Sequence, residues 1–150
     1  MQIHSEQEMI NFGQDFAKKI TPPHLIELIG DVGAGKTTFT KGLALGLGIS
    51  SDITSPTFTI SKRYPLKNSG EFIHYDFYRL PDAGLMLDEL SEAASGPNII
   101  IIEWSDTVKN ILPKNRTIIK IAITDETTRE ITVEQPSWFY ISTLPPTPVS

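Results

Sequence analysis

Hydrophobic positions along the chain follow two different periods, and this alternation predicts an α/β domain. Apolar side chains recur at helical spacing between residues 9 and 20, behind a capping box at residues 5–8, and two prolines at 22 and 23 end that helix. Residues 24–29 then form a short apolar run that is typical of a strand. Phe39, Leu43 and Leu47 return to helical spacing and predict a second helix, which glycines at 46 and 48 close.

The second half of the chain predicts more strands than helices. Residues 57–64 alternate, residues 71–78 resume an extended pattern, and the turn between them makes an antiparallel hairpin the expected arrangement. We expect a helix over residues 82–94. Residues 98–102 are apolar almost throughout, which indicates a strand buried on both faces of a sheet. Residues 117–123 and 129–133 predict a closing hairpin.

The length of 150 residues suits one domain, which we place at residues 1–135. Residues 136–150 form a C-terminal extension that we expect to be partly disordered, since its last eight residues, 143–150, are rich in proline. The apolar run at residues 138–141 is expected either to pack on the domain or to form a contact patch.

Charge and composition narrow the function further. The net charge is −5, which argues against this chain holding nucleic acid alone, because binding the backbone requires lysines and arginines. The absence of cysteine excludes a disulfide framework and thiolate metal sites. The sequence has no apolar run that would span a bilayer and no basic, apolar signal sequence at its start. We therefore expect a cytoplasmic protein that makes no membrane contact.

Residues 30–38, Gly-Asp-Val-Gly-Ala-Gly-Lys-Thr-Thr, fit the phosphate-binding P-loop pattern G-x-x-x-x-G-K-[ST]. Glycines let successive N–H groups point inward at phosphate oxygens, and the following helix directs its positive end at the same anion. Lys36 is expected to reach the β- and γ-phosphates, and the Thr37 hydroxyl to ligate Mg²⁺. The alternative is a glycine-rich turn that binds no nucleotide. The predicted nucleotide contacts in the loop are Val32, Gly33, Ala34, Gly35, Lys36, Thr37 and Thr38.

A P-loop also needs acidic groups for the metal shell and for the attacking water. Glu103 directly follows the strand at 98–102, so we expect it to serve Mg²⁺; the alternative is an exposed acid at a strand end. Asp76 is expected near the nucleotide, and without the P-loop it would be interpreted as a surface acid of the hairpin. Lys36, Asp76 and Glu103 are therefore the predicted catalytic residues.

Other candidate positions are less specific. Ser55-Pro56-Thr57 follows the P-loop helix, where nucleotide-sensing switches lie, but it is also typical of a proline turn that starts a strand. An aromatic such as Trp104 is more often a core residue than a functional one. The histidines lack metal-ligand spacing and are treated as structural: His4, His24 and His74. The four arginines are scattered, unlike those of a kinase lid, and the missing Asn-Lys-x-Asp motif disfavours a GTPase.

Taken in order, the P-loop, Ser-Pro-Thr-Phe, His-Tyr-Asp-Phe-Tyr-Arg-Leu and Ile-Glu-Trp resemble the TsaE family over about residues 5 to 133. The resemblance implies a three-layer α/β P-loop NTPase domain with a mixed, mainly parallel central sheet and an antiparallel hairpin. It implies one ATP and one Mg²⁺, with Thr37 and Glu103 at the metal and Asp76 near the γ-phosphate. It also implies that Glu6 and Arg129 approach the nucleotide. Trp104 would then be functional, and the candidate switch or partner residues are Ser55, Thr57, Tyr78, Arg79 and Trp104.

Members of this family are ATPases that assist threonylcarbamoyladenosine modification of tRNA. The resemblance implies TsaD and TsaB proteins as partners, contact with tRNA only through that complex, slow hydrolysis alone and an ATP cycle that supports multiple turnovers. The chain departs from the family pattern at residues 81–85. It also has Ser105 at a position where many members have proline. A P-loop small-molecule kinase is the second interpretation. A non-catalytic nucleotide-binding adaptor is the third, and the intact Lys36 and Glu103 argue against it.

Overall fold

The computed structural model describes residues 1–50, 53, 60–78, 82, 84 and 86–135. Three of the predicted switch or partner residues, Ser55, Thr57 and Arg79, lie outside the described residues, as does the predicted extension at 136–150. The predictions made for them stay predictions. Among the described residues, no helix has both the length and the apolar character needed to cross a membrane.

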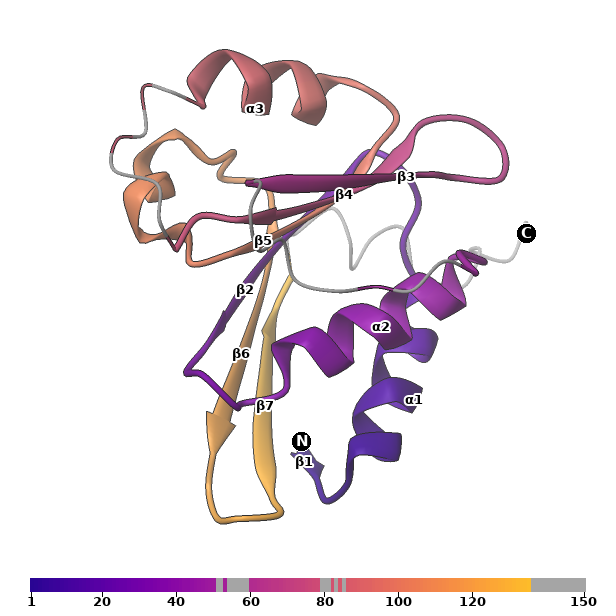
Figure 1. Ribbon diagram of the computed structural model, residues 1–150, viewed down its shortest axis with the longest axis vertical. Coiled ribbons are helices and arrows are strands. Elements are labelled where there is room, and N and C mark those ends of the chain that lie inside the picture. The colour runs from indigo at the N-terminus through magenta and orange to yellow at the C-terminus, as the bar shows by residue number, and fades with distance from the viewer. Residues whose placement is uncertain (51–52, 54–59, 79–81, 83, 85, 136–150) are drawn as a thin grey trace, which may run out of the picture.

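The described strands form one seven-stranded sheet in the order β1-β7-β6-β2-β5-β4-β3 (Figure 1). Their bounds are β1 (Gln2–Ile3), β2 (His24–Gly30), β3 (Ser61–Pro65), β4 (Glu71–Asp76), β5 (Ile99–Glu103), β6 (Thr117–Ile123) and β7 (Arg129–Glu134). The central neighbours β6, β2, β5 and β4 are parallel, whereas β3, β7 and β1 add to the two edges in antiparallel pairs. The sheet is therefore mixed with a parallel centre, which confirms the predicted fold class and both predicted hairpins.

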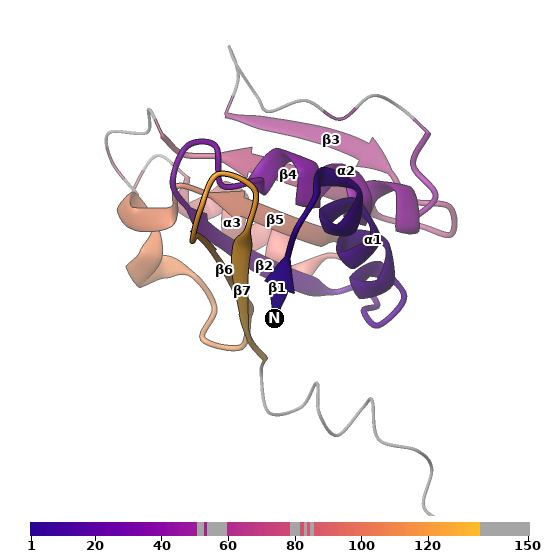
Figure 2. The ribbon, with the colours of Figure 1, turned by 90° about the horizontal axis from the view of Figure 1, so that it is seen from below.

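Helices cover both faces of this sheet and complete three layers. Helices α1 (Glu6–Ala17) and α2 (Lys36–Gly46) pack side by side on one face, and α3 (Leu87–Ser95) lies over the other (Figures 1 and 2). The short 3-10 helices η2 (Ser105–Thr107) and η3 (Lys109–Ile111) lie on the α3 side. Figure 2 also shows the N-terminal strand β1 beside β7, so that the two ends of the described chain meet at one edge.

Strand β5 joins the two hydrophobic cores. Ile99 and Ile101 belong to the core beneath α1 and α2, while Ile100 and Ile102 belong to the core beneath α3. All four are buried, because successive side chains of a strand point to opposite faces. This confirms the predicted strand that is buried on both sides.

Glycines allow an unusually close contact between α1 and α2. A Cβ atom on Gly42 would lie 2.3 Å from the carbonyl oxygen of Ile10, and one on Gly13 would lie 2.6 Å from that of Phe39. Any larger residue would therefore force the two helix backbones apart. Their approach also brings the start of α1 to the P-loop, since the Met9 methyl group lies 3.2 Å from where a Cβ of Gly35 would be.

Several predicted boundaries differ from the observed ones for local reasons. Helix α3 begins at Leu87 and not at Asp82, because the Asp82 carboxylate accepts a hydrogen bond from the Gly84 N–H and so forms a turn. Strand β4 ends at Asp76, whose carboxylate accepts from the Tyr78 N–H. The first helix ends at Ala17, although Ile20 is buried as its spacing predicted.

Candidate functional site

The P-loop joins the end of β2 to the start of α2, and its glycines set its shape. Gly33 and Gly35 have φ values of +82° and +108°, which residues with a side chain rarely adopt. The Ala34 N–H donates to the Asp31 carbonyl, and Gly35 then serves as the N-cap of α2. The loop is therefore a turn that ends at a helix N-terminus, an arrangement suited to an anion.

The ends of β4 and β5 bring two acidic side chains to the mouth of this loop. Asp76 and Glu103 are paired residues of the two parallel strands, and the Lys36 Nζ lies 4.0 Å from Glu103 Oε1. A cavity of about 340 Å³ opens over this cluster. It is lined by Val32, Gly33, Gly35, Lys36, Thr37, Thr38, Asp76, Glu103 and Trp104. The structure thus brings all three predicted catalytic residues and both predicted metal ligands together around one cavity.

Burial and charge oppose one another in this cluster. The pKa of Lys36 is lowered on balance. Desolvation lowers it more than the nearby carboxylates of Glu103, Asp76 and Asp31 raise it. Desolvation also raises the pKa of Asp76, with the Tyr78 N–H acting against it and the Glu103 charge adding to it. An ammonium group and two carboxylates in a partly dehydrated cavity suit the joint binding of an anion and a metal cation.

His74, one of the histidines predicted to be structural, lies beside this cluster. It is fully buried in β4, and its Nε2 lies 2.5 Å from Oε2 of Glu103. Its lack of metal-ligand spacing fits this position, because it contacts the side chain of a predicted metal ligand. The signal that could have found it is strand alternation, which places His74 and Asp76 on the same face of β4.

Trp104 lies at the cavity and not in the core that its residue type alone indicated. Its backbone is left-handed, with φ of 55°, and the Lys36 Nζ lies 3.9 Å from the centre of its ring. Tyr78 packs against it edge-on with ring centroids 5.0 Å apart, and remains 68% exposed. Trp104 and Tyr78, two of the candidate switch or partner residues, therefore form an aromatic pair in which Trp104 contacts Lys36.

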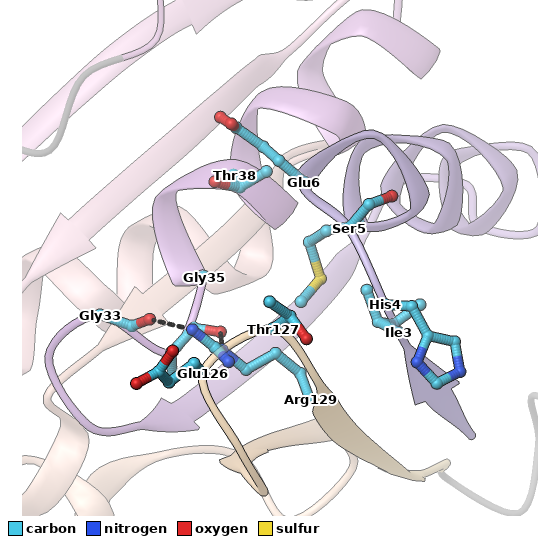
Figure 3. Close-up of a pocket in the computed structure, with 12 residues that line it drawn as sticks. Ile3, His4, Ser5, Glu6, Gly33, Gly35, Thr38, Glu126, Thr127 and Arg129 are labelled. Carbon is cyan, nitrogen blue, oxygen red and sulfur yellow. Dashed lines mark hydrogen bonds between the residues drawn. The ribbon is translucent and has the colours of Figure 1, made fainter.

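A second cavity, of about 460 Å³, adjoins the outer side of the P-loop (Figure 3). Glu6 and Met9 from α1, Thr38 from α2 and Arg129 from β7 line it together with Gly33–Gly35 of the loop. The Arg129 guanidinium donates to the carbonyl oxygens of Gly33 and Ala34, each at 3.2 Å. Arg129 therefore braces the P-loop backbone, and Glu6 and Arg129 line one cavity beside the loop.

Comparison with known proteins places the chain in a family. Residues 3–131 match the family model described as "Threonylcarbamoyl adenosine biosynthesis protein TsaE". A Bacillus subtilis protein named "tRNA threonylcarbamoyladenosine biosynthesis protein TsaE" is 44% identical over 119 residues, which cover 78% of this chain and 71% of the relative. A Treponema pallidum protein of the same name is 36% identical over 130 residues, covering 86% and 95%.

A solved structure agrees with these sequence matches. A crystal structure of Bacillus subtilis YdiB superimposes with a TM-score of 0.76 at 32% identity, covering 95% of this chain and 88% of that one. The resemblance inferred from the motifs is confirmed by the sequence matches, and the predicted fold by this structure. The chain belongs to the TsaE family.

Proposed function

We propose that this protein binds and hydrolyses ATP with Mg²⁺ and thereby assists threonylcarbamoyladenosine synthesis in tRNA. The observation that carries the proposal is the single cavity at which the P-loop, Lys36, Asp76 and Glu103 meet. Family membership and the names of the relatives support the pathway. The partners in this proposal are TsaD and TsaB proteins, and the ATP cycle supports multiple turnovers of their complex.

The donor set at the cavity fits Mg²⁺ held partly by the nucleotide itself. Among the described residues, no group of three or more histidine, cysteine, aspartate or glutamate side chains could hold a metal ion alone. Mg²⁺ typically takes one or two protein ligands and completes its shell with phosphate oxygens and water. Thr37 and Glu103 would be those ligands, and the bound ion would neutralise charge on the phosphate oxygens.

The chain's own residues divide the work around this cavity. Lys36 holds its buried positive charge against the β- and γ-phosphates, and the N–H groups of the P-loop surround the same oxygens. Asp76, with its raised pKa, orients water beside the γ-phosphate. His74 fixes the Glu103 carboxylate by contacting one of its oxygens, so that the other faces Lys36.

The proposal is tested by counting modified adenosines per mole of transferase complex by mass spectrometry of digested tRNA. With TsaD, TsaB, this protein and ATP, the yield should exceed one equivalent. Omitting the protein, or replacing it with the Lys36→Ala variant, should hold the yield near one turnover. Multiple turnovers without this chain would refute the role, and phosphorylation of a free small molecule would favour a kinase instead.

A further inference from the structure

A second buried carboxylate lies one strand away from Glu103. Glu27 stands in the middle of β2 and is 0% exposed. The Ser105 hydroxyl donates to its Oε2 at 2.5 Å, and the Arg116 Nε donates to its Oε1 at 3.1 Å. Arg116 also donates through Nη1 to the Pro113 carbonyl oxygen. Both oxygens of Glu27 therefore have a direct partner within the described chain.

Glu27 and Glu103 face opposite sides of the sheet. In the β2–β5 register Leu28 pairs with Glu103, whereas Glu27 pairs with Ile102. Ile102 belongs to the core beneath α3, and alternation places Glu27 on that face as well. A continuing strand would put the Glu103 and Ser105 side chains on the same face, yet they reach opposite faces, so the backbone leaves the extended conformation between them, at Trp104.

This change of direction gives Trp104 an unfavourable backbone conformation. A left-handed φ of 55° is rare for a bulky aromatic residue and persists only where neighbouring contacts enforce it. The contact before it is the bond from the Phe77 N–H to the Glu103 carbonyl oxygen, at 3.1 Å. The contact after it is the Ser105 hydroxyl on Glu27. Between these two anchors, the ring of Trp104 lies over the Lys36 ammonium.

We propose that Glu27, braced by Arg116, is a positioning residue that acts through Ser105 to hold the Trp104 ring against Lys36. A buried ion pair is often no more stabilising than apolar packing, so stability alone gives a weak reason for this one. Glu27 also accepts a hydrogen bond from Ser105, the residue after Trp104, and this bond can fix the backbone beside Trp104. The consequence for nucleotide binding rests on the function proposed above, but the placement of Trp104 does not.

The placement is tested by the fluorescence of Trp104 in protein without nucleotide. The chain has two tryptophans, so the Trp138→Phe background leaves Trp104 as the single probe. Ser105→Ala removes the hydroxyl and should free the turn, which shifts the emission to longer wavelength and increases quenching by acrylamide. Ser105→Thr keeps a hydroxyl and should preserve the signal.

The matched control is Thr117→Val, which removes another buried hydroxyl, one that contacts His24 at the start of β2 and Gln135 but not Ser105 or Glu27 in the described chain. It should lower the melting temperature without changing Trp104 emission or quenching. A folded Ser105→Ala variant whose emission and quenching match the parent protein would overturn the proposal. So would a Thr117→Val variant with the same spectral change, because the effect would then be general loosening.

The second arm measures ATP affinity by isothermal titration. Ser105→Ala should weaken binding by roughly threefold, the size expected when a cation–π contact with Lys36 is partly lost, and Ser105→Thr should restore it. If the parent protein fails to bind ATP, the proposed function falls while the fluorescence arm still decides the positioning role. If Ser105→Ala changes the fluorescence but leaves affinity unchanged, the link from Trp104 to Lys36 is refuted.

Discussion

Glu27 and Glu103 are buried carboxylates on neighbouring strands, yet their surroundings differ in one decisive respect. Glu27 has a direct hydrogen-bond donor on each oxygen, the Ser105 hydroxyl and the Arg116 guanidinium. Within the part of the chain that the structure describes, Glu103 has such a contact on one oxygen, from His74, while its other oxygen faces Lys36 at 4.0 Å at the cavity. The first carboxylate is enclosed, and the second is open on one side.

In the proposed function, this difference separates a structural charge from a ligand-binding one. A buried charge is stable only when charged or hydrogen-bonding groups compensate it. The compensation of Glu27 is complete within the protein, so the chain around it is held in one arrangement. Glu103 is compensated by His74 and by the more distant Lys36 ammonium at the cavity, where a metal ion would bind in the proposed function. Openness toward a cavity, and not burial itself, distinguishes the two.

The largest expected effect is on stability, at the enclosed carboxylate. Glu27→Gln should lower the free energy of unfolding by about 3 kcal/mol, because it leaves the Arg116 guanidinium without its anionic partner in a mostly buried site. The matched control is Glu89→Gln, whose pair with Arg63 has the same 3.1 Å separation but is exposed. That change should alter stability by less than about 1 kcal/mol. Urea unfolding measures both, and equal losses would contradict the comparison.

Replacing Glu103, the open carboxylate, should reduce activity much more than stability. Glu103→Gln should lower ATP turnover in the assembled TsaD–TsaB complex by about a hundredfold, since charge develops on phosphoryl oxygens during transfer. Its unfolding free energy should stay within about 1 kcal/mol of the parent value, because glutamine keeps an oxygen facing His74 and the carboxylates of Asp76 and Asp31 still act on Lys36. Asp76→Asn should also lower turnover more than it lowers ATP affinity. Full turnover in either variant would remove that residue from the proposed chemistry.

Replacing Lys36 tests the role of the cation that faces Glu103 in the cavity. Lys36→Ala removes the ammonium group that faces Glu103 and should weaken ATP binding at least about tenfold, as expected for a charge-assisted contact. Isothermal titration with ATP and Mg²⁺ measures the change, and GTP should bind more weakly than ATP to the parent protein. A folded variant that binds ATP with unchanged affinity would contradict the assignment of the P-loop.

The open site could be predicted from sequence because its signals are local. Lys36 and Thr37 lie in one short motif, and Glu103 directly follows a recognisable strand. Glu27 could not be predicted, because it lies inside an apolar run and its partners Ser105 and Arg116 are 78 and 89 residues away. Strand alternation places His74 on the face of Asp76, but its contact with Glu103 depends on the pairing of β4 with β5, which the sequence does not show. Ser105 was noticed only as a departure from the family pattern, and its bond to Glu27 gives that departure a physical role.

His24, a third buried ionisable group, differs from both carboxylates because the hydrogen bond described for it is with a neutral hydroxyl. His24 is 4% exposed, and its Nε2 lies 2.8 Å from the Thr117 hydroxyl. Burial lowers the pKa of His24 to about 4 from the usual 6.5. The unfolded chain therefore takes up a proton before the folded protein does as the pH falls. The stability associated with neutral His24 is complete above pH 6.5 and is lost as the pH falls toward about 4.

At this position the expected effect is a slope of at most about 1.4 kcal/mol of unfolding free energy per pH unit across that window, the smallest change at any one pH step. His24→Gln removes the titrating group and keeps a polar side chain, so its stability should fall less steeply between pH 6.5 and 4. Urea unfolding at several pH values compares the two slopes. The Glu89→Gln variant should retain the parent slope in this range, because Glu89 lies in an exposed pair away from His24. Identical slopes for His24→Gln and the parent would mean that His24 has the same pKa in the folded and the unfolded chain, and would contradict a pKa lowered by burial.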